Sequence, residues 1–171
     1  MRYVDAAAFD EYNANDGQEL VVSVLVDATV GEAFDTLLKR SWVGKNKELA
    51  PGVGRGLVGH SRQLSTGAIE TIQSSGLPQG DDAIASICYK LQVDQSWITQ
   101  DHIGLISFVP DTTTGKATTD KTLVMWAIKI VPTSFGSVFL CGGSLLRVVQ
   151  RAALTSVLDG LKNKLSKQKH Q

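Results

Sequence analysis

Residues 19–38 read ELVVSVLVDATVGEAFDTLL, and this stretch decides how the fold begins. Its first half is short and rich in valine, which favours a β-strand over residues 19–28. Thr29 can cap the N-terminus of a helix, and Glu32, three residues later, completes a capping box. Apolar residues then recur at the spacing of one helix face: Ala33, Phe34, Leu37 and Leu38. The chain is therefore predicted to open with a strand that runs directly into an amphipathic helix.

From residue 57 onward the sequence consists of short apolar runs separated by turn residues, a pattern typical of an antiparallel meander. Strands are predicted over residues 57–65, 68–74, 84–93, 97–109 and 123–131. Thr66-Gly67 lies between the first two runs and predicts a tight hairpin turn. Pro110 is expected to end the strand that precedes it. The connection before the meander is basic and glycine-rich, and short helical turns are expected over residues 39–50.

Residues 144–167 form the last predicted element, a long amphipathic helix. One helical face carries Leu146, Val149, Ala153, Val157 and Leu161, and three leucines widen this stripe: Leu154, Leu158 and Leu165. Such a stripe needs a large apolar surface to cover it, so we expect it to pack on the concave face of the sheet with Ala153 buried. The order strand, helix, meander and long helix predicts an α+β fold with a mostly antiparallel sheet.

Length and composition fit a single compact domain with a substantial apolar core. The chain has 171 residues, of which 43% are apolar and 20% are charged. It contains 17 Lys plus Arg and 17 Asp plus Glu, so its formal net charge is zero. Because a nucleic-acid-binding protein normally carries a basic excess, no nucleic-acid partner is expected.

Cys88 and Cys141 are too few for a disulfide framework, and we interpret them as reduced thiols of a cytoplasmic protein. The three histidines and two cysteines are scattered along the chain, which predicts no metal site. Acidic residues interrupt the first twenty positions, which argues against a signal peptide. The most apolar stretch, residues 122–146, contains Lys129 and Pro132, so no membrane-spanning segment is expected.

Residues 54–59 read GRGLVG and match the G-x-G-x-x-G pattern of dinucleotide-binding loops. That fingerprint requires a strand before it and a helix after it. Here residues 48–51, ELAP, precede the glycines, and a strand-like run follows them. We therefore predict a loop that enters a strand, and no cofactor.

Arg62 and Glu70 lie four residues to either side of Thr66, so a hairpin turn there makes them cross-strand neighbours on one face. Two interpretations are open. The pair either faces a cavity, where it can orient a polar group of a ligand, or forms an exposed ion pair worth less than about 1 kcal/mol.

Four aromatic residues and one histidine lie within the predicted strands: Tyr89, Trp97, His102, Phe108 and Trp126. These residues either pack the core or line a ligand cavity that also contains a few polar groups. No arrangement of serine, cysteine, histidine and acidic residues along the chain indicates a nucleophilic triad, so no catalytic residue is predicted.

Several short motifs occur in an order that resembles the helix-grip superfamily, also called START-like or SRPBCC, and is closest to the polyketide cyclase/dehydrase-like proteins. After the opening strand and helix these motifs are VGHSRQL at residues 58–64, TGAIE at 66–70, YKL at 89–91, VMWAIKIVP at 124–132 and GLKNKL at 160–165. The resemblance covers residues 19–167 and implies one START-like domain. An N-terminal extension, residues 1–18, and a short tail, residues 168–171, flank it.

The resemblance implies a curved antiparallel sheet of six to seven strands, wrapped around the long C-terminal helix, with an internal apolar cavity between them. It also implies that six strand residues point toward this cavity: Arg62, Glu70, Tyr89, His102, Phe108 and Trp126. The helix face that carries Val149, Ala153 and Val157 would close the cavity.

Residues 130–146 contain no charged residue and are rich in glycine and apolar residues, including Phe139. Three accounts of this segment are open. It is a lid that buries Phe139 against the ligand, a site of transient contact with a membrane or partner, or a buried connection that caps the core. The first account makes Phe139 a candidate ligand-binding residue.

We expect the protein to bind or transport a small hydrophobic ligand, such as a lipid, sterol, isoprenoid or aromatic polyketide. The alternative is a cofactor-independent cyclase or dehydratase, in which His102 or Glu70 removes a proton and Arg62 stabilises an oxyanion. A third hypothesis is a protein that recruits a partner through its basic helix. Convergent titratable groups with perturbed pKa values would favour the enzyme, and a nearly all-apolar cavity would favour the carrier.

Overall fold

The computed structural model describes residues 2–3, 6–44, 46–78, 83–92, 99–111, 118–133 and 144–168. The strands are β1 (Arg2–Tyr3), β2 (Gln18–Val26), β3 (Lys47–Ala50), β4 (Ser61–Gln63), β5 (Ile69–Gly76), β6 (Ala83–Gln92), β7 (Thr99–Asp111) and β8 (Thr118–Pro132). The helices are α1 (Ala6–Ala14), α2 (Val30–Ser41) and α4 (Ser144–Gln168).

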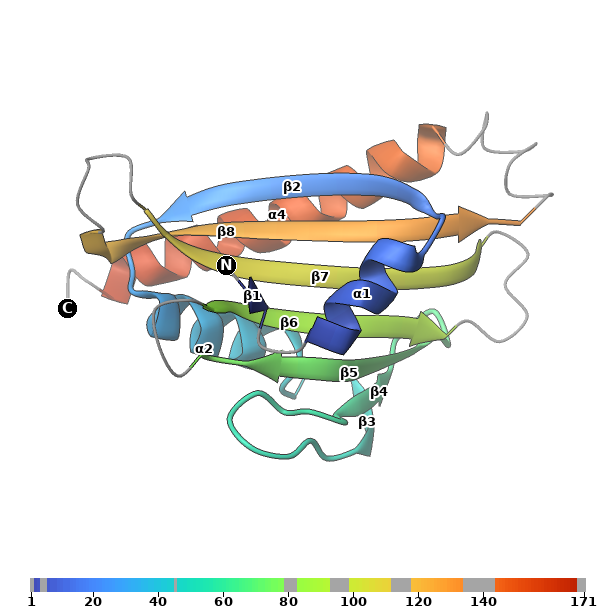
Figure 1. Ribbon diagram of the computed structural model, residues 1–171, viewed down its shortest axis with the longest axis horizontal. Coiled ribbons are helices and arrows are strands. Elements are labelled where there is room, and N and C mark those ends of the chain that lie inside the picture. Colours follow the sequence, from blue (N-terminus) through green and yellow to red (C-terminus); the bar gives the residue numbers. More distant parts are fainter. Residues whose placement is uncertain are drawn as a thin grey trace.

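Seven of the strands form one curved antiparallel sheet in the order β2-β8-β7-β6-β5-β4-β3 (Figure 1). Strands β4 to β8 follow one another along the sheet as they do along the chain, which is the meander that the turn residues predict. The two-residue strand β1 pairs in parallel with the start of β6. The predicted α+β class, the antiparallel sheet and the long C-terminal helix are confirmed.

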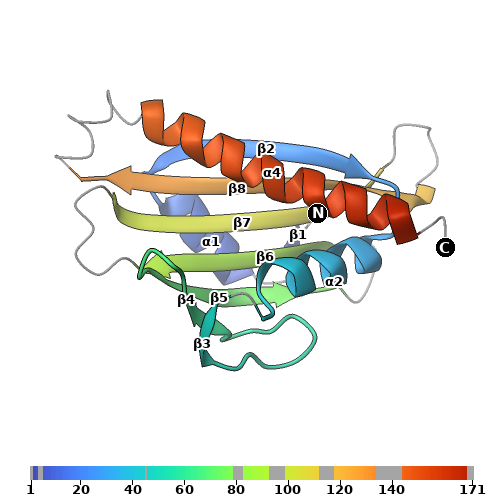
Figure 2. The ribbon, with the colours of Figure 1, turned by 180° about the vertical axis from the view of Figure 1, so that it is seen from behind.

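The two faces of the sheet are covered differently. Helices α2 and α4 lie on one face, here called the inner face, and α1 lies on the other, the outer face (Figures 1 and 2). The larger apolar core lies at the inner face, where Ile87, Phe108 and Ile128 pack with residues of α2 and α4. A smaller cluster lies on the outer face, where Tyr12 of α1 packs with Cys88, Ile103 and Leu105.

Helix α2 forms as the sequence predicts. The Thr29 side chain accepts a hydrogen bond from the Glu32 backbone N–H, and the Glu32 carboxylate accepts one from the Thr29 N–H, so the capping box is complete. The predicted apolar face is fully buried: Ala33, Phe34, Leu37 and Leu38. This helix therefore closes one end of the inner face, and the residues that follow its last turn enter the site described below.

The N-terminal extension contains β1 and α1, which pack on the sheet, although α1 has only a weak apolar periodicity. Two local predictions are wrong. Residues 47–50 form the edge strand β3 in place of helical turns, and most of its side chains are exposed, so no alternating pattern marks it. Strand β7 runs through Pro110 to Asp111, with a register shift at that point, because a proline is tolerated where strand pairing is irregular.

The buried face of α4 also differs from the prediction. Leu154, Leu158, Leu161 and Leu165 are buried, whereas Ala153 and Val149 are exposed and Val157 is only half-buried. Only the leucine side of the predicted stripe is therefore buried, and its Val149 and Ala153 side is exposed. The cause is the position of α4, which lies along β2 at the edge of the sheet and against α2 (Figure 2). In the described part of the chain, no helix is long and apolar enough to cross a membrane.

Candidate ligand-binding site

Six predicted site residues lie on five consecutive strands of the sheet and are all buried: Arg62, Glu70, Tyr89, His102, Phe108 and Trp126. The register brings them to one face, because Arg62 pairs with Glu70, and His102 pairs with Leu91, two residues from Tyr89. The Tyr89 and His102 rings lie 6.0 Å apart, and the Tyr89 and Trp126 rings 6.2 Å apart. All of them except Phe108 form a polar and aromatic cluster on the inner face.

Arg62 and Glu70 form a buried ion pair at the centre of this cluster. Arg62 Nε donates to Glu70 Oε2 at 2.7 Å, and Arg62 Nη2 lies 2.5 Å from the same oxygen. Arg62 Nη1 donates to the backbone carbonyl of Ser41 at the end of α2. Each side chain of the pair is only 8% exposed. The interpretation of an exposed ion pair is therefore wrong, and the pair joins the hairpin to α2.

Trp42, the first residue after α2, completes the cluster. The Arg62 guanidinium lies over the Trp42 ring, with Cζ 5.2 Å from the ring centroid. The same ring stacks on Trp126 at 6.2 Å and meets Tyr89 edge-on at 5.7 Å. Sequence analysis did not identify Trp42 as a site residue. The sequence feature that could have identified it is a large aromatic side chain within an otherwise polar, glycine-rich connection, since such a side chain is usually buried.

Gly104 makes room for the Tyr89 ring. The two residues are paired across β6 and β7, and a Cβ on Gly104 would lie 2.2 Å from the Tyr89 ring. The Tyr89 hydroxyl accepts a hydrogen bond of 2.9 Å from Trp126 Nε1. Tyr89 therefore lies across the sheet toward β8, and a glycine on the intervening strand is what permits this.

Burial dominates the acid–base properties of the cluster. It raises the pKa of Glu70, while the Arg62 guanidinium and, more weakly, the nearby Trp42 N–H lower it. Burial also raises the pKa of the Tyr89 hydroxyl far above its ordinary value, and the negative charge of Glu70 raises it further. Tyr89 is therefore a neutral hydrogen-bond donor, and ionised Glu70 is destabilised by its surroundings.

Some buried polar atoms of the described residues near this cluster have no hydrogen-bond partner. They include Ser41 Oγ, Trp42 Nε1 and His60 Nε2. His60 Nδ1 lies 3.8 Å from the Glu48 carboxylate. Buried polar groups are rarely left unpaired in folded proteins, so these atoms mark places where water or a ligand would be favoured.

Phe108 marks the apolar end of the inner face. It packs edge-on against Phe34 of α2 at 5.4 Å and is 1% exposed. Val157 contacts the same core from α4. Phe139 lies outside the described residues. The predicted residues therefore divide into a polar group around Arg62 and an apolar group around Phe108, and Val149 and Ala153 belong to neither.

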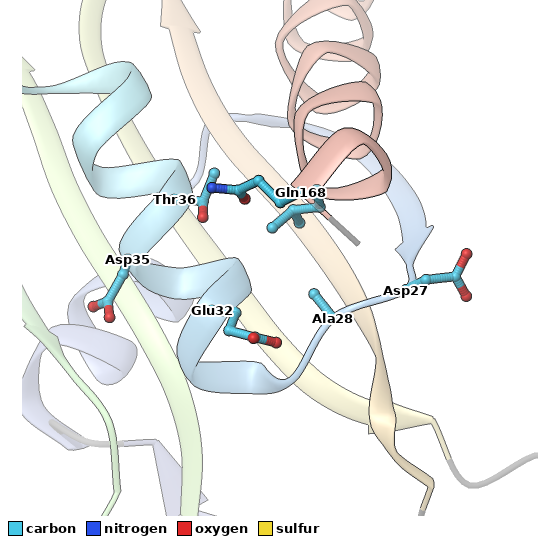
Figure 3. A pocket seen from close by; sticks show the side chains of 7 residues that line it. Asp27, Ala28, Glu32, Asp35, Thr36 and Gln168 are labelled. Carbon is cyan, nitrogen blue, oxygen red and sulfur yellow. The ribbon is translucent and has the colours of Figure 1, made fainter. Parts of the chain in front are cut away.

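A hollow of about 350 Å³ lies between the start of α2 and the end of α4, away from the predicted residues (Figure 3). Its lining contains three carboxylates: Asp27, Glu32 and Asp35. Glu32 is engaged in the capping box, and Asp35 is bound by Arg55 at 2.6 Å. Within the described ranges, no group of three or more histidine, cysteine or acidic residues could hold a metal ion.

Residues 54–59 form a turn that leads toward β4, as the context of their glycines predicts. Val53 and Val58 are bridged across this turn, and Gly54 and Gly59 have positive φ angles. The glycines therefore serve a tight turn before a strand, and their surroundings are not those of a dinucleotide loop.

Comparisons with known proteins identify the fold. No protein-family model matches the chain, and no curated protein does so either. A solved structure from Nitrosospira multiformis covers 90% of this chain and 100% of its own, with 18% identity and a TM-score of 0.58. Norcoclaurine synthase from Thalictrum flavum covers 89% and 96%, with 11% identity and a TM-score of 0.57. Ara h 8.0201 covers 88% and 98%, with 7% identity and a TM-score of 0.58.

At these identities the likeness concerns the fold alone. Norcoclaurine synthase and Ara h 8 are Bet v 1-like proteins with a helix-grip fold. The chain shares with them a curved seven-stranded antiparallel sheet and a long C-terminal helix, so it has the helix-grip fold.

Proposed function

We propose that the protein binds a small, largely apolar ligand at the inner face of its sheet, between the strands and helices α2 and α4. The observation that carries this proposal is the division of that face into two parts. A cluster with an ion pair and two hydrogen-bonding aromatic residues adjoins a surface of isoleucine, valine and phenylalanine. Ligand sites are typically apolar with a few polar groups that fix orientation.

The fold is compatible with this proposal and with both binding and catalysis. One structural neighbour, norcoclaurine synthase, was solved in complex with a transition-state analogue. A protein with this fold can therefore hold a transition-state analogue.

Between a carrier and an enzyme, the contacts of Arg62 favour the carrier. All three of its guanidinium nitrogens already contact Glu70 or the Ser41 carbonyl, which leaves Arg62 poorly placed to stabilise an oxyanion. The cyclase alternative is supported by one observation, the convergence of Glu70 and Tyr89, whose pKa values are both raised. A raised pKa makes Glu70 a better base but makes Tyr89 a poorer acid.

Native mass spectrometry of protein purified from its source tests the proposal. The expected result is a co-purifying apolar molecule in one-to-one ratio that is lost from the variant Ile106→Arg, which places a charge on the inner face. Val21→Arg is the matched control, because the Val21 side chain on β2 is exposed, and this variant should retain the molecule. Turnover of the bound molecule by wild type but not by Glu70→Gln would instead support the enzyme. Protein that carries nothing and binds no apolar probe would contradict both functions.

A further inference from the structure

We infer that the inner-face cluster recognises a hydroxyl group on the apolar ligand, through the Trp42 indole N–H, the Tyr89 hydroxyl and the free carboxylate oxygen of Glu70. This inference rests on the proposed binding function and adds the chemical class of the ligand. The inference is based on two hydrogen-bond donors and one acceptor that lie in a single buried cluster and have no partner among the described residues.

The first unused valence is the indole N–H of Trp42. Trp42 is 1% exposed, and its Nε1 has no hydrogen-bond partner. An indole nitrogen can only donate, and the nearby acceptor, the Glu70 carboxylate, lies outside hydrogen-bond geometry. Leaving such a group unpaired is costly, which favours an occupant at this position.

The second unused valence is the proton of the Tyr89 hydroxyl. Its oxygen accepts from Trp126 Nε1 at 2.9 Å, which leaves the O–H of Tyr89 available to donate. In the described part of the chain, Tyr89 makes no other hydrogen bond. The Tyr89 and Trp42 ring centroids lie 5.7 Å apart, so the two donors belong to neighbouring side chains of one cluster.

The third unused valence is an acceptor. Arg62 directs both of its contacts with Glu70 to Oε2, so Oε1 can accept a further hydrogen bond. The Trp42 N–H is near enough to lower the pKa of Glu70, but the two groups fall outside hydrogen-bond geometry. A single polar atom placed beside both groups would therefore satisfy both.

Two donors and one acceptor are the complement of a hydroxyl group. An alcohol or phenol accepts up to two hydrogen bonds and donates one, so it can use all three valences at once. An ether of the same shape can accept the two hydrogen bonds but has no proton to donate to Glu70 Oε1. A carboxylate also lacks that proton, and its charge is repelled by ionised Glu70. The site should therefore prefer hydroxylated apolar ligands over both analogues.

Calorimetric titration with 2-naphthol, 2-methoxynaphthalene and 2-naphthoate tests this preference, because the three share one ring system. We expect wild type to bind 2-naphthol about tenfold more tightly than either analogue, which corresponds to one or two net hydrogen bonds. If all three bind with equal affinity, the hydroxyl inference is wrong while the binding function stands. If none binds, both are wrong.

Trp42→Phe removes only the N–H and part of the ring. It should reduce the preference for 2-naphthol, measured as the ratio of its affinity to that of 2-methoxynaphthalene, about fivefold. Tyr89→Phe should reduce the ratio similarly and serves as the readout if Trp42→Phe does not fold. Tyr12→Phe is the matched control, because Tyr12 lies in the outer-face cluster and its hydroxyl donates to Glu19 at 2.8 Å, and the preference of this variant should stay within about twofold of wild type. An unchanged ratio in both Trp42→Phe and Tyr89→Phe would show that water satisfies these donors and would overturn the inference.

Discussion

Arg62 and Glu70 face each other across the β4–β5 hairpin, and both Arg62 contacts converge on a single carboxylate oxygen of Glu70. A turn centred near Thr66 sets this register, with the Gly67 N–H bonded to the Leu64 carbonyl and Gly67 at a φ of 86°. The pair is buried because Trp42 and the end of α2 lie over it. A local turn thus determines the pairing, and a distant helix determines the burial.

The first prediction concerns the coupling between these two residues. Arg62→Met should lower the free energy of unfolding by about 3 kcal/mol or more, because it leaves the Glu70 carboxyl buried without its partner. The double variant Arg62→Met/Glu70→Leu should cost less than the sum of the two single changes, since it removes both charges. Urea denaturation of all four proteins measures this cycle, and additive costs would mean that the pair is not energetically coupled.

The second prediction follows from the raised pKa of Glu70. A folded-state pKa above the unfolded value means that the native protein binds more protons in that interval, so stability falls as pH rises through it. The Glu70→Gln variant lacks this ionisation. Compared with that variant, wild type should therefore lose stability as the pH rises from the ordinary glutamate range toward neutrality. If wild type instead gains stability relative to Glu70→Gln as the pH rises, Arg62 and not burial controls the pKa of Glu70.

The third prediction concerns the position of Tyr89. Gly104→Ala places a methyl group in the space of the Tyr89 ring and should destabilise the protein by about 1–3 kcal/mol. The change should also break the hydrogen bond from Trp126, which near-ultraviolet circular dichroism can detect. Gly31→Ala on α2 is the control, because only side-chain atoms lie near its Cβ, at 3.5 Å or more. The control should be neutral or stabilising, as alanine is favoured in helices.

The sequence predicted those parts of the fold whose determinants are local. The capping box of α2, the hairpin turn at Gly67 and most strands of the meander each depend on residues within a few positions of one another. Six of the ten candidate site residues lie together on the inner face because strand alternation and turn position place them there. Periodicity and turn chemistry were sufficient for these features.

Features that depend on packing between distant elements could not be predicted. The apolar stripe of α4 is wide enough that two different faces could be buried, and its contact with β2 and α2 selected the leucine face. Trp42 follows a helix in a connection without periodicity, so only the folded arrangement reveals its contacts with Arg62 and Trp126. The width of the stripe led to the assignment of Val149 and Ala153 to the site. The lack of periodicity around Trp42 led to its omission.

The fourth prediction tests the orientation of α4. Leu158→Ala should lower the free energy of unfolding by about 2–5 kcal/mol, because this side chain is 1% exposed. Ala153→Asp should change it by less than about 0.5 kcal/mol, because residue 153 is exposed. Chemical denaturation of both variants makes the comparison. A large loss in Ala153→Asp together with a small one in Leu158→Ala would show that the Val149 and Ala153 side of the helix is the buried one.

The central claim is that an apolar ligand occupies the inner face of the sheet, and isoleucine methyl groups report on each face separately. Ile87, Ile106 and Ile128 belong to the inner-face core, whereas Ile103 lies in the outer-face cluster beneath α1. Protein labelled at isoleucine methyl groups and saturated with 2-naphthol should show intermolecular nuclear Overhauser effects from the ligand to the three inner methyl groups and none to Ile103. Effects confined to Ile103, or none to any inner methyl group at saturation, would contradict the account.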